Sequence, residues 1–286
     1  MEKRRKAIVA GSFYDSDRDS LLYQIKNCFL HEVGPGILPD IDRYKNERKI
    51  KGIISPHAGF VFSGPVAAHG YLKLSYEKEP DTIVIIGPNH RGFGKEISIM
   101  SNGYWDTPLG TIGIDENTAK NIMNFDKKNI IEDDIKAHTY EHSIEVQLPF
   151  LQYIYPNKRF KIIPISVINQ QLSVMNYLAE VLFKATEDIS CLYIASSDFT
   201  HYENQESAKR KDTEAIERII NMDSNKLYDT IKYNNTTICG PGPISLVIEI
   251  CKKYKVEKGI LLKYATSGDV SGMNEQVVGY ASIMFQ

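Results

Sequence analysis

The chain has 286 residues, 42% of them hydrophobic, which is enough to bury the core of one large domain or of two small ones. Its 34 Lys and Arg residues are balanced by 36 Asp and Glu residues, so it lacks the basic excess that binding to nucleic-acid phosphates usually requires. No apolar stretch approaches the roughly 20 residues of a membrane-spanning helix, and the first residues lack the apolar region of a signal peptide.

The four cysteines show no paired spacing, so we expect reduced thiols of a cytoplasmic protein and no disulfide framework. They are Cys28, Cys191, Cys239 and Cys251. The basic run Lys3–Lys6 is short, and we expect it to be a solvated tail. These features indicate no nucleic-acid partner and no membrane partner.

Helical and strand-like patterns alternate along the chain. A helix capped by Asp15 or Ser16 is expected to run to about Glu32, and a second helix is expected to begin at Pro65. Further helices are predicted over residues 115–125, 142–155, 172–186, 206–222, 226–233 and 243–254. Strands are predicted over residues 52–57, 83–86, 97–106, 111–114, 160–167, 191–196, 260–265 and 277–285. The economical interpretation is a single three-layer α/β/α domain over residues 1–286, with a mixed central sheet.

Three of the predicted strands are followed closely by polar side chains that can bind a ligand. The first leads to His57, the second to His90, and the third to Asp198 and His201. In open α/β sheets, ligands bind at the carboxyl ends of the strands. A lone histidine in such a place more often only hydrogen-bonds within a turn, but two in matched positions make a metal site an equal alternative.

Cys239 lies in a Gly- and Pro-rich loop just before a predicted helix, where the helix dipole favours a thiolate. A thiolate could be a soft metal ligand or a nucleophile, while the simpler interpretation is a small buried residue in a tight loop. Asp198 and His201 could place a carboxylate and an imidazole in one cleft as ligand and general base, or Asp198 could only cap the following turn. Glu141 is expected to be only a helix-dipole partner.

Five short motifs occur in a fixed order along the chain. They are Ser55-Pro56-His57-Ala58-Gly59, Gly87-Pro88-Asn89-His90, Glu141-His142-Ser143-Ile144-Glu145, Ser196-Ser197-Asp198-Phe199-Thr200-His201 and Thr237-Ile238-Cys239-Gly240. Together they strongly resemble the Memo family, and the resemblance spans nearly the whole chain. Memo proteins are similar to the class III non-haem iron extradiol dioxygenases of the LigB type, so the resemblance implies a LigB-like α/β fold.

The resemblance also implies roles for single residues. His57 and His90 match the two metal-binding histidines of the dioxygenases, and Cys239 stands where those enzymes have a carboxylate ligand. His201 matches their catalytic histidine, with Asp198 beside it. Two histidines and a thiolate favour a soft or redox-active metal, so we expect one Fe(II) or Cu(I) ion per chain, with zinc as a substitute. The implied function is that of an iron- or copper-dependent oxidoreductase with an unknown small-molecule substrate.

Two other functions stay open. The chain could be a binding or scaffold protein that keeps the dioxygenase fold without turnover, or a metal-free cysteine hydrolase with Cys239 as nucleophile and His201 or His57 as base. Animal Memo proteins are linked to adaptors that bind phosphotyrosine peptides, but Phe13 and Phe62 stand where those proteins have Trp and Tyr, so we do not extend peptide binding to this chain. Microbial Memo proteins are often encoded beside a radical-SAM protein, which implies a protein partner in a shared pathway.

Overall fold

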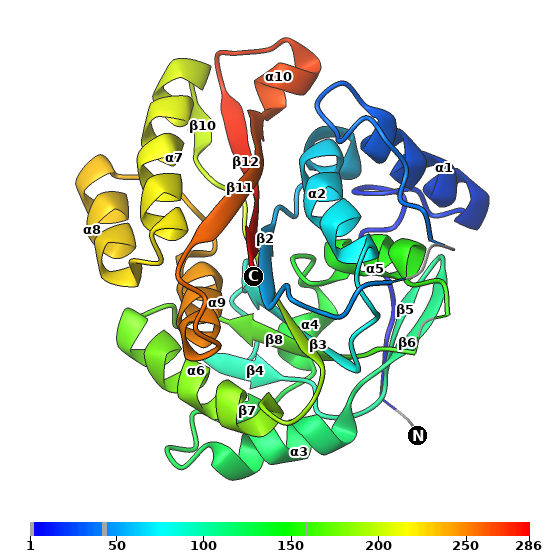
Figure 1. The fold of residues 1–286 in the computed structure, drawn as a ribbon, viewed down its shortest axis with the longest axis vertical. Helices are drawn as coiled ribbons and strands as arrows, with labels where there is room; N and C mark the ends of the chain where they lie inside the picture. The colour runs from blue at the N-terminus through cyan, green and yellow to red at the C-terminus, as the bar shows by residue number, and fades with distance from the viewer. Residues whose placement is uncertain (1–2, 42–44, 158) are drawn as a thin grey trace.

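The computed structural model describes residues 3–41, 45–157 and 159–286, and within these residues a mixed sheet of nine strands forms the centre of the protein (Figure 1). In chain order, its strands are β2 (Gly52–Ser55), β3 (Thr82–Pro88), β4 (Ile97–Ile99), β7 (Ile131–Asp133), β8 (Lys161–Val167), β9 (Cys191–Ser196), β10 (His201–Glu203), β11 (Gly259–Thr266) and β12 (Val277–Phe285). They lie in the order β10-β12-β2-β9-β3-β8-β4-β7, and β11 pairs with β12.

Four neighbouring strands, in the order β2-β9-β3-β8, run parallel to one another. Every residue of β2, β9 and β3 is buried, and a continuous β-branched run such as Ile83–Ile86 suits a strand that is covered on both faces. β12 and β4 flank these strands in the antiparallel direction, which makes the sheet mixed. Because parallel strands end at the same edge of a sheet, the segments that carry His57, Asp198 and His90 meet there.

Helices cover both faces of the sheet. They are α1 (Arg18–Leu30), α2 (Phe60–Ser75), α3 (Glu116–Phe125), α4 (Lys136–Thr139), the 3-10 helix η1 (Glu145–Gln147), α5 (Leu148–Ile154), α6 (Leu172–Thr186), α7 (Gln205–Ile220), α8 (Ser224–Asn234), α9 (Pro241–Lys253) and α10 (Ser267–Ser271). On one face, α2 contacts β2, β11 and β12 and packs against α1 and α5 (Figure 1). On the other face, α9 contacts β2, β3 and β9 and packs against α6, α7 and α8. The predicted α/β fold with a mixed central sheet is confirmed, and the two helical faces give it three layers.

A second, smaller sheet includes the start of the described chain. Its strands are β1 (Arg4–Arg5), β5 (Tyr104–Thr107) and β6 (Gly110–Gly113). Arg5 is buried, where its guanidinium pairs with the buried carboxylate of Glu145 and lies 4.5 Å from the centre of the Trp105 ring. The prediction of a solvated tail is therefore wrong for Arg5, because the alternation of a strand turns it inward while Arg4 stays exposed.

Some predicted elements agree with the structure at their ends, and others differ. α6 covers the predicted residues, and Asp115 caps α3 as expected. α2 begins at Phe60, so the prediction that Pro65 starts this helix is wrong; the Phe60 N–H donates to the carbonyl oxygen of Phe13 at 2.7 Å, which supports the earlier start. The strand predicted over residues 97–106 is divided between β4 and β5, which belong to different sheets.

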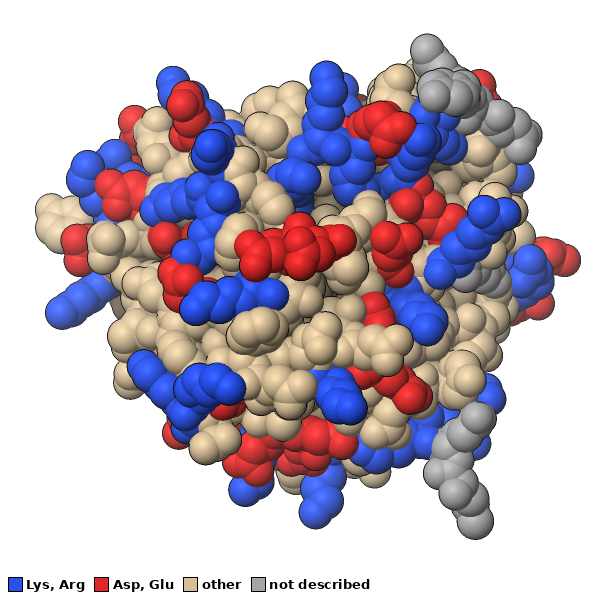
Figure 2. Space-filling model, turned by 60° about the horizontal axis from the view of Figure 1, so that its bottom comes forward, with Lys and Arg blue, Asp and Glu red and all other residues tan. Residues whose placement is uncertain are grey.

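Charged side chains of both signs are distributed over the surface. Figure 2 shows one face on which basic and acidic side chains are interspersed, in agreement with their nearly equal numbers in the sequence. Within the described residues, every helix is too short or too polar to span a bilayer.

Replacing Arg5 with Ala is expected to lower the free energy of unfolding by about 3–5 kcal/mol, because Glu145 would keep a buried charge without its partner. Arg4→Ala in the same strand is the matched control. Arg4 is exposed and pairs with Asp106 at 2.9 Å, so its loss should cost at most about 1 kcal/mol. Urea unfolding followed by circular dichroism compares the two variants. Equal losses would show that the buried pair does not anchor the N-terminal strand.

Candidate metal centre

Three side chains that can bind a metal converge at the carboxyl edge of the parallel strands. His57 follows β2, His90 follows β3, and Cys239 lies in the loop before α9. Each offers one ligand atom, and these atoms all lie within 4.8 Å of one another. The Cys239 Sγ is 3.3 Å from the Nε2 of His57, and the ring centres of the two histidines are 5.1 Å apart. These three residues form a group that could hold a metal ion.

The hydrogen bonds of His57 leave its Nε2 atom available to a metal. Its Nδ1 lies 2.8 Å from the Oγ of Ser196, and that hydroxyl donates its own proton to the Ser143 carbonyl oxygen at 2.6 Å. The Ser196 oxygen must therefore accept a hydrogen bond from Nδ1–H, and it also accepts one from Gln147 at 2.9 Å. With the proton on Nδ1, the lone pair of His57 lies on Nε2, on the side of Cys239.

Glu141 orients His90 in the same way. Its carboxylate accepts hydrogen bonds from the backbone N–H of His90 at 2.6 Å and from the ring Nδ1 at 2.9 Å. It also accepts from the backbone N–H groups of His142 and Ser143, both at 2.9 Å. Although burial by itself raises the pKa of Glu141, the hydrogen bond and charge of His90 outweigh it and lower the pKa to about 2. Glu141 is thus more than the helix-dipole partner that the sequence suggested.

The loop of Cys239 is held from two sides. The backbone N–H of Asp198 donates to the Cys239 Sγ at 3.2 Å, and the side-chain amide of Gln170 donates to the Cys239 carbonyl oxygen at 2.9 Å. Gly240 must be glycine, because a Cβ atom at this position would lie 2.7 Å from the Cβ of Ser197. The sulfur is therefore placed by the ends of β9 and β8 as well as by its own helix start.

Burial favours the neutral forms of Cys239 and His57. It raises the pKa of the Cys239 thiol, and the nearby Asp198 carboxylate raises it further. It also lowers the pKa of His57, as do the neighbouring His142 and His90. The predicted thiolate at the helix start is therefore opposed by desolvation. A bound cation would reverse this balance, because it stabilises a thiolate directly, and neutral imidazoles are the form that binds metals.

Asp198 and His201 lie at different distances from this group. One carboxylate oxygen of Asp198 accepts the backbone N–H of His57 at 2.8 Å, and the other is 4.0 Å from the His57 Nε2. Burial raises the pKa of Asp198 to about 6, opposed by the hydrogen bond from His57. The His201 Nδ1 is 2.9 Å from the carbonyl oxygen of Thr237, and His201 belongs to neither of the possible metal-binding groups found among the described residues.

Comparisons with known proteins identify the family and the fold of the chain. A family model described as Memo-like protein matches residues 5–284. The chain belongs to the Memo family. A MEMO1 family protein of Sulfurisphaera tokodaii is 45% identical over 98% of this chain and 99% of its own length, and one of Methanopyrus kandleri is 43% identical over 99% of both chains. The crystal structure of the uncharacterized protein JW3007 from Escherichia coli K12 shares the fold, with a TM-score of 0.57 and 12% identity over 83% of this chain and 100% of that chain.

His142 is a further residue of this Memo centre that the strand-end pattern did not identify. Its ring centre lies 4.8 Å from that of His90 and 5.4 Å from that of His57, and it packs against Phe13. Burial lowers the pKa of His142 to about 4, so the ring is neutral near pH 7. His90, Glu141 and His142 also form a possible ligand group. Glu141, however, already accepts hydrogen bonds from four N–H donors and serves to orient His90. The one signal in the sequence was the Glu-His pair within the third motif.

A buried carboxylate positions the segment that leads to His201. Asp212 on α7 accepts hydrogen bonds from the backbone N–H and hydroxyl of Thr200, at 3.1 and 2.6 Å, and from the hydroxyl of Tyr264 at 2.7 Å. Within the described residues it has no ion pair with a basic side chain. Burial raises the pKa of Asp212 to about 6, although the bonds from Thr200 and Tyr264 oppose this shift. The cost of ionising this carboxylate therefore comes from its removal from water, because its oxygens already accept three hydrogen bonds.

The stability of the protein should therefore depend on pH through Asp212. Its folded pKa of about 6 lies above the roughly 3.9 of an unfolded chain, so its protonated form stabilises the fold at low pH, and this contribution is lost as the pH rises through 6. Asp212→Asn keeps the shape without the titration. Relative to this variant, the wild type should lose about 2 kcal/mol of unfolding free energy between pH 4 and 7.

Urea unfolding at several pH values measures this difference. The exposed Asp188→Asn serves as the control and should follow the wild type at every pH. A wild-type minus Asp212→Asn difference that does not change with pH would contradict the assignment of a raised pKa to Asp212.

Proposed function

We propose that this Memo protein binds one Fe(II) or Cu(I) ion through the Nε2 atoms of His57 and His90 and the sulfur of Cys239, and that it carries out redox chemistry on a small-molecule substrate. One observation carries the proposal: three ligand atoms from separate elements lie within 4.8 Å, while both Nδ1 atoms are already engaged by Ser196 and Glu141. Such outer hydrogen bonds are the usual companions of metal-binding histidines.

The donor set supports the choice of metal. Two imidazoles and a thiolate are softer than two imidazoles and a carboxylate, which favours Cu(I) and leaves Fe(II) and Zn(II) as acceptable ions. Three protein ligands leave a position for substrate, as in other catalytic metal sites. A bound Fe(II) or Cu(I) ion would supply one-electron redox chemistry at this position.

The protein's own groups can then handle protons beside the ion. Asp198 has a pKa of about 6 and a carboxylate oxygen 4.0 Å from the His57 Nε2, so it can accept a proton at neutral pH without leaving the site. Because the His201 Nδ1 donates to the carbonyl of Thr237, the lone pair of His201 lies on Nε2. We propose Asp198 and His201 as the proton acceptors of the reaction.

A cysteine hydrolase is the second candidate, and the 3.3 Å contact between Cys239 and His57 favours it. Such an enzyme needs a thiolate beside a protonated imidazole. Burial opposes both charges here, since it raises the pKa of Cys239 and lowers that of His57. The metal-binding function therefore agrees better with the electrostatics of the site, and a scaffold without turnover is the remaining alternative.

Single substitutions in the group should remove the metal and leave the fold intact. His57→Ala and Cys239→Ser are each expected to weaken anaerobic binding of Fe(II) and Cu(I) by about a hundredfold or more, because each removes one of three ligands. Glu141→Gln should weaken it by roughly 10- to 100-fold through the orientation of His90. Titration of apo protein, with metal content read by mass spectrometry, makes the comparison.

Two variants serve as controls in this titration. His201→Ala lies outside the ligand group and should keep the wild-type affinity while losing any oxygen- or peroxide-dependent turnover. Cys191→Ser tests whether loss of any cysteine has the same effect, since Cys191 is buried at the start of β9. If Cys239→Ser binds both metals as tightly as the wild type, the thiolate is not a ligand and the hydrolase or scaffold function moves ahead.

The affinity for the metal should also rise with pH. Cys239 must release its thiol proton when it binds, so the apparent affinity is expected to increase by about tenfold for each pH unit between 6 and 8. Competition with a chelator of known affinity, at three pH values and without oxygen, measures the slope. Cys239→Ser should show a smaller slope than the wild type, and an equal slope in the two proteins would argue against a thiol proton as its source.

A further inference from the structure

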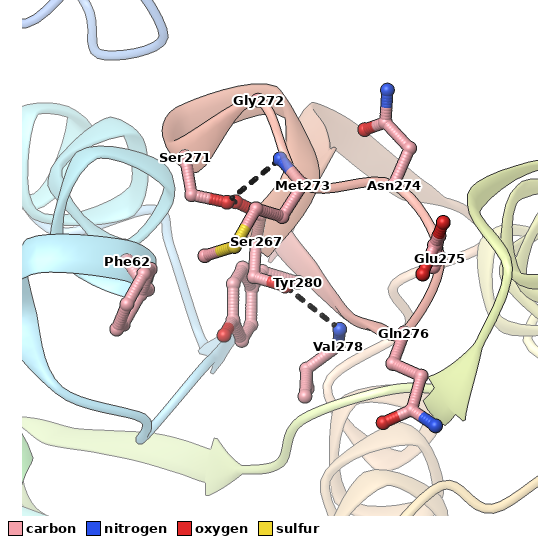
Figure 3. Close-up of a pocket in the computed structure, with 10 residues that line it drawn as sticks. All are labelled: Phe62, Ser267, Ser271, Gly272, Met273, Asn274, Glu275, Gln276, Val278 and Tyr280. Atoms are coloured by element: carbon pink, nitrogen blue, oxygen red, sulfur yellow. Dashed lines mark hydrogen bonds between the residues drawn. The ribbon is translucent and has the colours of Figure 1, made fainter.

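A cavity of about 660 Å³ lies between the first turn of α2 and the chain from α10 to β12 (Figure 3). This volume falls within the range of small-molecule sites. Its apolar walls come from Phe62, Met273, Val278 and Tyr280, and Figure 3 shows the end of the Met273 side chain reaching toward the space between the rings of Phe62 and Tyr280. Phe62 is 39% and Met273 is 71% exposed, so both keep apolar surface that a bound molecule could cover.

Hydrogen bonds within the protein hold the polar side chains of the cavity wall in place. The hydroxyl of Ser267 accepts the backbone N–H of Val278 at 3.0 Å, and that of Ser271 accepts the backbone N–H of Met273 at 3.2 Å (Figure 3). α10 begins with a capping box between Thr266 and Asp269. Gln205 on α7 bonds to both of these residues and to the carbonyl of Asn274, which ties the wall to the body of the protein.

The elements that line the cavity adjoin segments that carry residues of the candidate metal centre. Phe62 follows His57 by five residues along the chain and lies in α2, which starts directly after Gly59, the last residue of the first motif. Val278 is the strand partner of His201, and the backbone N–H of Phe199 donates to the carbonyl of Gly279 at 2.8 Å. Asp198 and Tyr280 thus lie on directly paired segments, and burial, followed by the charge of Asp198, raises the pKa of the Tyr280 phenol.

The negative charge of one lining residue indicates which ligands the cavity favours. Glu275 is the one charged residue among the described residues that line the cavity, and within those residues it has no ion pair with a basic side chain. Its carboxylate disfavours an anionic ligand and attracts an ammonium group. The aromatic rings of Phe62 and Tyr280 suit a flat apolar body, and their faces also attract a cation.

We infer that this cavity is the substrate-recognition subsite of the metal centre and that it takes a small aromatic amine, with the ring between Phe62, Met273 and Tyr280 and the ammonium group at Glu275. The inference rests on the proposed function, because it names the substrate class of the same centre. The binding itself involves no metal ligand, so it can be tested without the metal.

Three probes of similar size but different charge test the inference on the full-length protein: tyramine, 4-ethylphenol and 4-hydroxyphenylacetate. Calorimetric titration should give the order tyramine, then 4-ethylphenol, then 4-hydroxyphenylacetate, from tightest to weakest. Glu275→Gln should weaken tyramine by roughly five- to tenfold and leave 4-ethylphenol unchanged. Phe62→Ala should weaken tyramine and 4-ethylphenol alike, by roughly tenfold. Tyr233→Ala, which removes a 90% exposed ring from α8, is the control and should change neither.

The outcomes separate this inference from the proposed function. No binding of any probe, equal binding of all three, or an unchanged affinity of the Phe62→Ala variant for tyramine would overturn the inference. Cys239→Ser should keep the wild-type affinity for tyramine while losing the metal, and Glu275→Gln should keep the metal. A Cys239→Ser variant that retains the metal but binds tyramine normally contradicts the metal proposal and leaves the cavity's ligand class supported.

Discussion

The buried polar side chains of segment 141–147 hold the centre of this protein together. They are Glu141, Ser143, Glu145 and Gln147, each at most 1% exposed. A buried polar group without a partner costs about 1–3 kcal/mol, and a buried charge costs more, so all four side chains require partners. Glu141 bonds to the chain after β3 and Ser143 to the last residue of β3, and Gln147 bonds to the chain after β2 and to β9. Glu145 bonds to the N-terminal segment, so one stretch of chain fixes four parts of the fold.

The same hydrogen bonds determine which atoms of His57 and His90 can bind a metal at the carboxyl edge of the parallel strands. They assign the ring protons of His57 and His90 to Nδ1 and leave both Nε2 atoms as acceptors next to the sulfur of Cys239. Burial then keeps the thiol and the His57 imidazole neutral, whereas Glu141 remains ionised through its bonds to His90. A site with three converging soft donors and a nearby negative charge is better suited to a cation than to a charged nucleophile. For a cysteine hydrolase, the distance between Cys239 and His57 is therefore suitable, but burial disfavours the charged thiolate and imidazolium that such an enzyme needs.

The centre also depends on a glycine, Gly87, where a side chain would clash, and on the side-chain amide of Gln170, which both donates and accepts a hydrogen bond. A Cβ atom at Gly87 would lie 2.3 Å from the Oγ of Ser143. This close approach lets segment 141–147 lie directly against the end of β3. Gln170, after β8, donates to the carbonyl of Cys239 and accepts from the N–H of Gly242, so it joins the fourth parallel strand to the start of α9. Rigid strand ends therefore support loops that carry the donor atoms, as in other α/β sheets.

The sequence by itself determined the fold class, the family and the residues His57, His90 and Cys239 as candidates. Continuous β-branched runs and alternating helices are local patterns, and the strand-end position of the histidines follows from them. It could not show that β9 lies between β2 and β3, nor that Glu141 and Ser196 orient the two rings, because these contacts join residues 50 to 140 positions apart. The burial of Arg5 was mispredicted for the same reason, and so was the ease of forming a thiolate at Cys239, which desolvation opposes. Charge and solvation of a side chain depend on what packs over it, and only the tertiary structure decides that.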